Sequence, residues 1–190
     1  MLTLTRRCGE RIAIGTSIEI TVLDVSGGRV RLGISAPRET PVHRGEVVER
    51  IERENQRAVV RGQGAEASDS AICFPDGLYG MRDQQSFLLC NVAEGGSFRV
   101  LVSRQDPMMR LLVVDATEVW PGYPVDEARA AAGLTDEDVA VAAVVTAPAD
   151  GSEATVNLMA PIVIGMKTRR GSQVILERGE LGLRHAMQAR

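Results

Sequence analysis

The chain has 190 residues and a formal net charge of −3, a length that suits one domain or two small ones. Residues 1–62 hold 11 Arg against 8 Asp and Glu (net +3), whereas residues 63–190 hold 10 Arg and one Lys against 17 Asp and Glu (net −6). This division favours a first half that faces nucleic acid and an acidic second half; the alternative is ordinary solubility charge. No apolar run has transmembrane length and the three cysteines lack metal spacing. We therefore expect a cytoplasmic protein with buried thiols and with no membrane partner, metal or cofactor.

Apolar and polar residues alternate through the first part of the chain, which is typical of half-buried strands. The expected strands, with a hairpin turn at Ser26-Gly27-Gly28, are Leu2–Arg6, Arg11–Ile14, Ser17–Val25 and Arg29–Ser35. Pro37 and Pro41 then interrupt the chain, and a short strand at Val42-His43 is expected to follow.

The period changes at Gly45–Ala58, where Val47, Val48 and Ile51 form a narrow apolar stripe among charged residues. This pattern predicts an amphipathic helix. Because the stripe fades after Ile51, we expect the end of the helix to project from a small core.

Three segments of this region resemble the CsrA/RsmA family of bacterial post-transcriptional regulators. They are Met1-Leu2-Thr3-Leu4-Thr5-Arg6-Arg7, Gly33-Ile34-Ser35-Ala36-Pro37 and Val42-His43-Arg44, and the resemblance covers residues 1 to about 57. It implies a strand-exchanged β-sandwich homodimer with a C-terminal helix. It also implies binding to a GGA element in a hairpin loop of an mRNA leader, which blocks ribosome access and represses translation.

The resemblance implies a composite RNA site, in which the first strand of one protomer lies beside the last strand and helix start of the other. Its residues here would be Leu4, Thr5, Arg6 and Arg7 on one side, and Thr40, Val42, His43, Arg44, Glu46 and Val47 on the other. The chemistry is suitable, because an arginine fork can contact phosphate or guanine and a strand backbone can bond exposed base edges. Pro41 and Gly45 depart from the family pattern within this site, which puts RNA affinity in question.

A segment at 62–69, rich in small and polar residues, is the expected linker between domains 1–61 and 70–190. After it, strand-like runs with turn signals predict a small, nearly closed β-barrel. The expected helix is Val125–Ala132, and the expected strands are Ala71–Phe74, Ser86–Asn91, Ser97–Val102, Arg110–Val114, Val139–Val145, Ala154–Met159, Ile162–Ile164 and Gln173–Leu176.

Three segments of the second half resemble the FliW family of flagellar assembly factors. They run from Phe74 to Gly80, from Ala154 to Ile164 and from Gly171 to Leu176, and the resemblance covers residues 70 to about 186. It implies a barrel that binds flagellin and also binds CsrA. The chain departs from the family before Phe74, where a small, polar stretch replaces the expected opening strand.

The two resemblances together predict a translational repressor of flagellin and motility genes joined to its own antagonist. The predicted surface between the halves lies on the late helix, at Glu49, Arg50, Arg53, Asn55 and Arg57. The alternative is a flagellin-binding assembly chaperone whose first part serves only for dimerisation. No nucleophile motif, P-loop or zinc-binding signature is present in the sequence, so we expect no enzyme activity.

Overall fold

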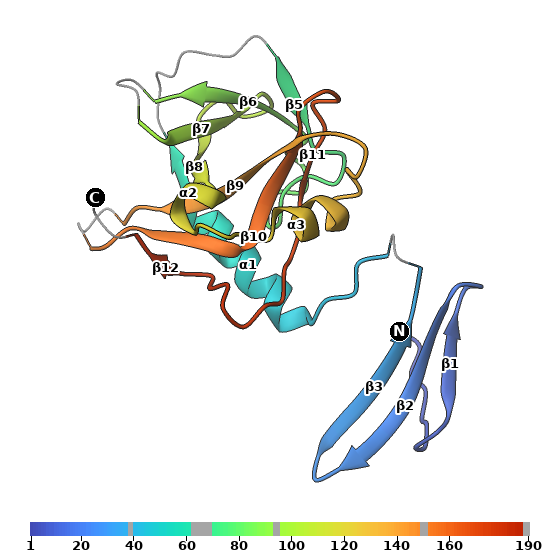
Figure 1. Ribbon diagram of the computed structural model, residues 1–190. Coiled ribbons are helices and arrows are strands. Elements are labelled where there is room, and N and C mark those ends of the chain that lie inside the picture. The colour runs from blue at the N-terminus through green and yellow to red at the C-terminus, as the bar shows by residue number, and fades with distance from the viewer. Residues whose placement is uncertain (38–39, 62–69, 93–95, 149–151, 188–190) are drawn as a thin grey trace. The chain divides into compact units, whose positions relative to one another are not determined.

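The computed structural model describes residues 1–37, 40–61, 70–92, 96–148 and 152–187 (Figure 1). The chain divides into two compact units, Met1–Val42 and His43–Arg190. This division differs from the predicted boundary, because the helix assigned by sequence to the first domain packs within the second unit. The predicted linker at 62–69 lies outside the described residues.

The first unit is a three-stranded antiparallel sheet in the order β1-β2-β3. Its strands are β1 (Arg11–Ile14), β2 (Ile18–Ser26) and β3 (Arg29–Ser35). Gly27 and Gly28 both have positive φ, at 54° and 77°, which a tight two-residue hairpin turn requires. The predicted β2–β3 hairpin is therefore confirmed, with one register shift between Val22 and Asp24.

Two strand predictions in the first unit are wrong for the single chain. Residues 1–7 and the pair Val42-His43 have no regular secondary structure. A strand forms only where a neighbour accepts its backbone hydrogen bonds, and within the described residues of this chain neither segment has a ladder partner. Alternation alone therefore does not show that the N-terminal segment pairs as a strand.

The first unit has almost no core of its own. Among its described residues, Val22 is the one buried apolar side chain, at 7% exposure. Val30, Leu32 and Ile34 alternate along β3 and are each about half exposed, at 56%, 51% and 46%. They form an apolar stripe on one face of the strand, because alternate residues of a strand share a face.

The second unit is a barrel-like sheet, in agreement with the predicted fold class. Nine strands of its described part hydrogen-bond in the order β11-β10-β9-β8-β7-β6-β5, with β12 on β10 and β4 on β8. They are β4 (Val59–Arg61), β5 (Ala71–Cys73), β6 (Ser86–Asn91), β7 (Phe98–Ser103), β8 (Met109–Asp115), β9 (Val139–Thr146), β10 (Thr155–Gly165), β11 (Gly171–Gln173) and β12 (His185–Ala186). A single parallel bridge between Cys73 and Arg170 joins the two ends of this order, so the barrel is nearly closed.

The core of the barrel depends on a close contact between its first and last segments. The Phe74 ring packs edge-on against Phe87, with the ring centroids 5.4 Å apart. A Cβ atom at Gly171 would lie 2.3 Å from the Phe74 ring, so no larger residue fits there without displacing the ring. Phe74 and Gly171, which belong to two of the three FliW-like segments, are therefore in close contact in the core.

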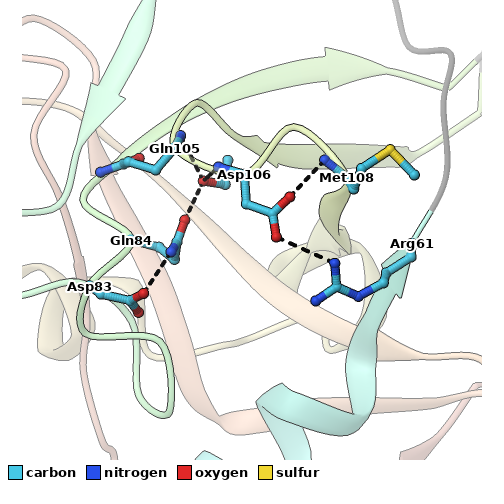
Figure 2. Close-up of polar contacts among 7 residues, drawn as sticks. Arg61, Asp83, Gln84, Gln105, Asp106 and Met108 are labelled. Carbon is cyan, nitrogen blue, oxygen red and sulfur yellow. Dashed lines mark hydrogen bonds and ion pairs between the residues drawn. The ribbon is translucent and has the colours of Figure 1, made fainter.

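Helix α1 (Gly45–Ala58) lies against the barrel and leads directly into β4 (Figure 1). Ile51 and Ala58 are buried at 0% and 2% exposure, so the prediction that the helix end projects from its core is wrong. The reason is that the buried face of the helix continues past Ile51 through Asn55 and Ala58, and Ala58 packs in the core of the barrel. Figure 2 shows how β4 is fixed at its end, where Arg61 forms a 3.4 Å ion pair with Asp106 in the β7–β8 loop.

Several short elements escaped prediction. Strands β4 and β12 and the helix α2 (Ala116–Val119) were not expected, whereas α3 (Val125–Ala131) was. The runs expected at Ala154–Met159 and Ile162–Ile164 form one strand, β10, with a register shift between Asn157 and Ile162.

Cys8 and Cys73 are exposed, so the expectation of buried thiols holds only for Cys90. Among the described residues, no helix is long and apolar enough to span a membrane.

Candidate nucleic-acid interface

The N-terminal side of the predicted RNA site is an open segment. Leu4 is 43% exposed, and among the described residues Arg6 donates only to the backbone oxygens of Thr5 and Arg11, at 2.9 and 3.3 Å. The Arg7 side chain is exposed, and its backbone N–H donates to Glu10 Oε2 at 2.7 Å. The charged ends of both arginines are thus available to a polyanion.

The other side of the predicted site is divided between the two units. Thr40 and the exposed Val42 belong to the first unit, whereas His43, Arg44, Glu46 and Val47 belong to the second. The residues at the start of α1 thus lie in the second unit, whereas Leu4–Arg7 lie in the first.

The start of α1 contacts an acidic residue of the barrel. Arg44 Nη2 lies 2.6 Å from Glu177 Oε2, and His43 Nδ1 lies 3.8 Å from Glu177 Oε1. Arg44 is the N-cap residue of the helix, and its guanidinium, which cannot accept a capping bond, pairs with Glu177. The forked cation that would contact RNA is therefore already paired with a carboxylate.

Val47 differs from its predicted role. Its side chain is only 7% exposed and packs in a cluster with Ile51, Ala160, Ile175 and Leu183. In the docked position of α1 this side chain is covered by the barrel, whereas Glu46 remains exposed.

A loop of the barrel packs against the C-terminal half of helix α1. Asn55, 1% exposed, donates from Nδ2 to the backbone oxygen of Tyr79 at 2.9 Å and to Gln173 Oε1 at 2.8 Å. Gly80, with φ +77°, lies so close to the helix that a Cβ there would be 2.8 Å from the backbone oxygen of Glu52. Gln173 Oε1 also accepts from the backbone N–H of Tyr79 at 3.0 Å, which fixes the loop in position.

A second polar contact anchors the end of the helix. Both oxygens of Glu54 accept hydrogen bonds from Arg184, at 2.7 and 2.9 Å, and Arg57 lies 3.1 Å from one of them. Hydrogen bonding from Arg184, together with the charges of Arg184 and Arg57, holds the pKa of Glu54 below its ordinary value despite partial burial.

The predicted helix surface is therefore a contact surface in part. Asn55 is buried against the barrel, whereas Glu49, Arg50, Arg53 and Arg57 remain exposed to solvent. Sequence reasoning missed the barrel residues that bind the helix, which are Gly80, Gln173, Glu177 and Arg184. Gly80 lies in the first FliW-like segment and Gln173 in the third, but nothing local in the sequence indicates which partner either one faces. Within the residues that the structure describes, no group of three or more His, Cys, Asp or Glu side chains is arranged to hold a metal ion.

Comparison with known proteins supports a two-part chain. The family model described as the FliW protein matches residues 58–187, and the CsrA model, described as the global regulator protein family, matches residues 1–53. The chain is 54% identical over 66 residues to the translational regulator CsrA of Leifsonia xyli subsp. xyli (strain CTCB07), covering 35% of this chain and 78% of that protein. It is 57% identical over 58 residues to the CsrA of Shouchella clausii (strain KSM-K16), covering 30% of this chain and 73% of that protein.

A solved structure matches the second unit. The crystal structure of the flagellar assembly factor FliW covers 69% of this chain and 96% of its own, with a TM-score of 0.58 and 26% sequence identity. The fold and these matches define a translational regulator fused to a flagellar assembly factor. The chain belongs to the CsrA family in its N-terminal part and to the FliW family from residue 58 onward.

Proposed function

We propose that this chain represses translation by binding GGA-containing mRNA leaders of flagellin and motility genes, and that its FliW-like part holds the RNA-contacting segment closed. The observation that carries the proposal is the position of α1. The CsrA match ends at residue 53, inside this helix, yet the helix packs on the FliW-like barrel with Arg44 paired to Glu177 at 2.6 Å.

Glu177 supports antagonism by direct competition. A carboxylate and an RNA phosphate or guanine edge use the same forked donors of arginine, so Arg44 cannot bind both in full. The burial of Val47 adds to this effect, because the helix must shift before that side chain can meet a base. Flagellin, as a partner of the FliW-like part, would favour RNA binding if it bound better to the barrel without the docked helix.

Homodimerisation is part of the proposal. The first unit leaves Val30, Leu32 and Ile34 about half exposed and buries too little to be stable alone. A second copy could cover this stripe and supply the missing neighbour for residues 1–7.

We expect the full chain to sediment as a dimer. Leu32→Asp should convert it to a monomer, because a charge would replace a large apolar side chain in the covered stripe. Ser35→Asp places the same side chain on the opposite face of β3 and should leave the dimer intact. Analytical ultracentrifugation at several concentrations measures both, and a monomeric wild-type chain would contradict the proposed dimer.

Removing the charge of Glu177 should strengthen RNA binding. An exposed ion pair is worth up to about 1 kcal/mol, so Glu177→Gln should raise affinity for a GGA hairpin by up to about fivefold. Glu180→Gln is the matched control, because Glu180 pairs with Arg178 at 2.7 Å and not with the helix. Fluorescence anisotropy on the full chain, at fixed salt, gives the comparison.

The same titration tests the proposal as a whole. Adding flagellin should raise the affinity of the wild-type chain for a GGA hairpin. It should raise the affinity of the same chain for a hairpin without GGA by less. Equal responses to Glu177→Gln and Glu180→Gln would contradict competition at Arg44. If neither the wild type nor any variant binds RNA, the chain is instead a flagellin-binding chaperone with a dimerisation module.

A further inference from the structure

A basic cavity lies between helix α1 and the last described segment of the chain. Its volume is about 350 Å³. It is lined by Arg50, Arg53, Glu54, Arg57, Leu183 and Arg184. The cavity exists only while the helix is docked, because Leu183 and Arg184 come from the FliW-like part and the other residues come from the helix.

The charges in this cavity are unbalanced. Four guanidinium groups face one carboxylate, and Glu54 is already shared between Arg184 and Arg57. Arg53 bonds only to the backbone oxygen of Glu49, at 3.2 Å, and Arg50 has no polar partner among the described residues. Two arginines therefore present unneutralised charge to whatever enters.

The lining favours the phosphates of a strand over its nucleobases. No aromatic ring and only one apolar side chain, Leu183, line the cavity, so a base has nothing to stack on. Arg50, Arg53 and Arg57 follow one face of α1 over about 10 Å, which is long enough to meet more than one phosphate of a strand. Arginine forks match phosphate oxygens in pairs.

We propose that this cavity binds backbone phosphates of single-stranded RNA, independently of base sequence, while the helix is docked. This inference rests on the proposed function, because the ligand would be the single-stranded RNA that flanks the GGA element. As a consequence, the chain would still bind RNA weakly while helix α1 is docked and Arg44 is paired with Glu177. When the helix is released from the barrel, the mRNA leader would then already be at high local concentration.

The test uses the full chain and oligouridine, which lacks GGA, in anisotropy titrations across a range of salt concentrations. The double variant Arg50→Gln, Arg53→Gln should weaken binding several-fold and reduce the slope of log K against log salt by about 1.4, the value for two lost phosphate contacts. The control, Arg99→Gln with Arg104→Gln, removes the same charge from exposed positions outside the cavity and should leave the slope unchanged.

Three outcomes would overturn the inference. Equal slope changes in both double variants would mean diffuse attraction, and no change in either would mean that the cavity binds no phosphate. Calorimetry with inorganic tripolyphosphate tests whether the ligand is a small polyphosphate and not RNA. If the cavity variant abolished tight tripolyphosphate binding but left oligouridine binding unchanged, the cavity would be assigned to a small polyphosphate. Failure of the proposed function looks different, because preference for GGA over a replaced sequence would be missing while oligouridine binding remained.

Discussion

Asn55→Asp is expected to release helix α1 from the barrel and to raise RNA affinity tenfold or more. The amide of Asn55 donates to Tyr79 O at 2.9 Å and to Gln173 Oε1 at 2.8 Å, and both of these partners are acceptors. A carboxylate would lose both donated bonds and place its charge beside these two acceptor oxygens, keeping only the bond that Asn55 Oδ1 accepts from Gln173 Nε2 at 3.3 Å. Burying a charge that one 3.3 Å hydrogen bond compensates only in part costs about 3 kcal/mol, which shifts the docking equilibrium about a hundredfold.

Asn91→Asp is the matched control, since it makes the same chemical change at an exposed position at the end of β6. Hydrogen exchange of the α1 amides, measured beside RNA binding, should show faster exchange in Asn55→Asp alone. Faster exchange without a gain in RNA affinity would show that docking of the helix does not close the RNA site. Uniformly faster exchange across the barrel would indicate general unfolding, so the two effects are separable.

Gly80→Ala should have the second largest effect, through shape and not charge. At φ +77° an alanine is strained by about 1 kcal/mol, and its Cβ would lie 2.8 Å from the Glu52 backbone oxygen. Because the two nearest atoms both belong to the Glu52 backbone and cannot rotate away, the helix and the loop must move apart. We expect weaker docking, with loss of the Asn55–Tyr79 bond, and a several-fold gain in affinity for a GGA hairpin.

Gly133→Ala is the control that distinguishes the effect of backbone strain from the effect of the close contact at Gly80. Gly133 also has positive φ, at 67°, but a Cβ there would meet nothing within 4 Å. Differential scanning calorimetry and the RNA titration should show a small loss of stability and unchanged affinity for this control. If both glycine variants changed RNA affinity alike, the effect would come from backbone strain, and the close approach at Gly80 would have no role in closing the site.

The strong local patterns of the sequence predicted much of the fold. Alternation gave β1, β3 and β6 at their observed bounds, and the change of period gave α1 at Gly45–Ala58. Gly27-Gly28 gave the hairpin, because two positive φ angles in succession suit glycine. The strand expected at Leu2–Arg6 failed for a reason of the same kind: alternation describes faces, whereas a strand also needs a partner for its backbone.

The candidate site was predictable as a set of residues but not as an arrangement. Arg44 and Asn55 were recognisable within the CsrA-like part, yet their partners Glu177 and Gln173 are 133 and 118 residues away in sequence. An ion pair or amide contact at that separation leaves no periodicity or local motif. The same is true of the cavity, because Arg184 joins Arg50 and Arg53 only through the docking of the helix.

The sequence by itself determined the family membership of both parts, the mainly β class and the helix that lies between them, because each depends on short-range patterns. Only the tertiary structure decided to which unit that helix belongs. Its apolar residues could be covered by any complementary surface. They pack here with Ile175, Leu183 and Ala160, and Gly80 permits the close approach of the helix. Burial of Ile51, and the pairing of Arg44 with Glu177, follow from that choice.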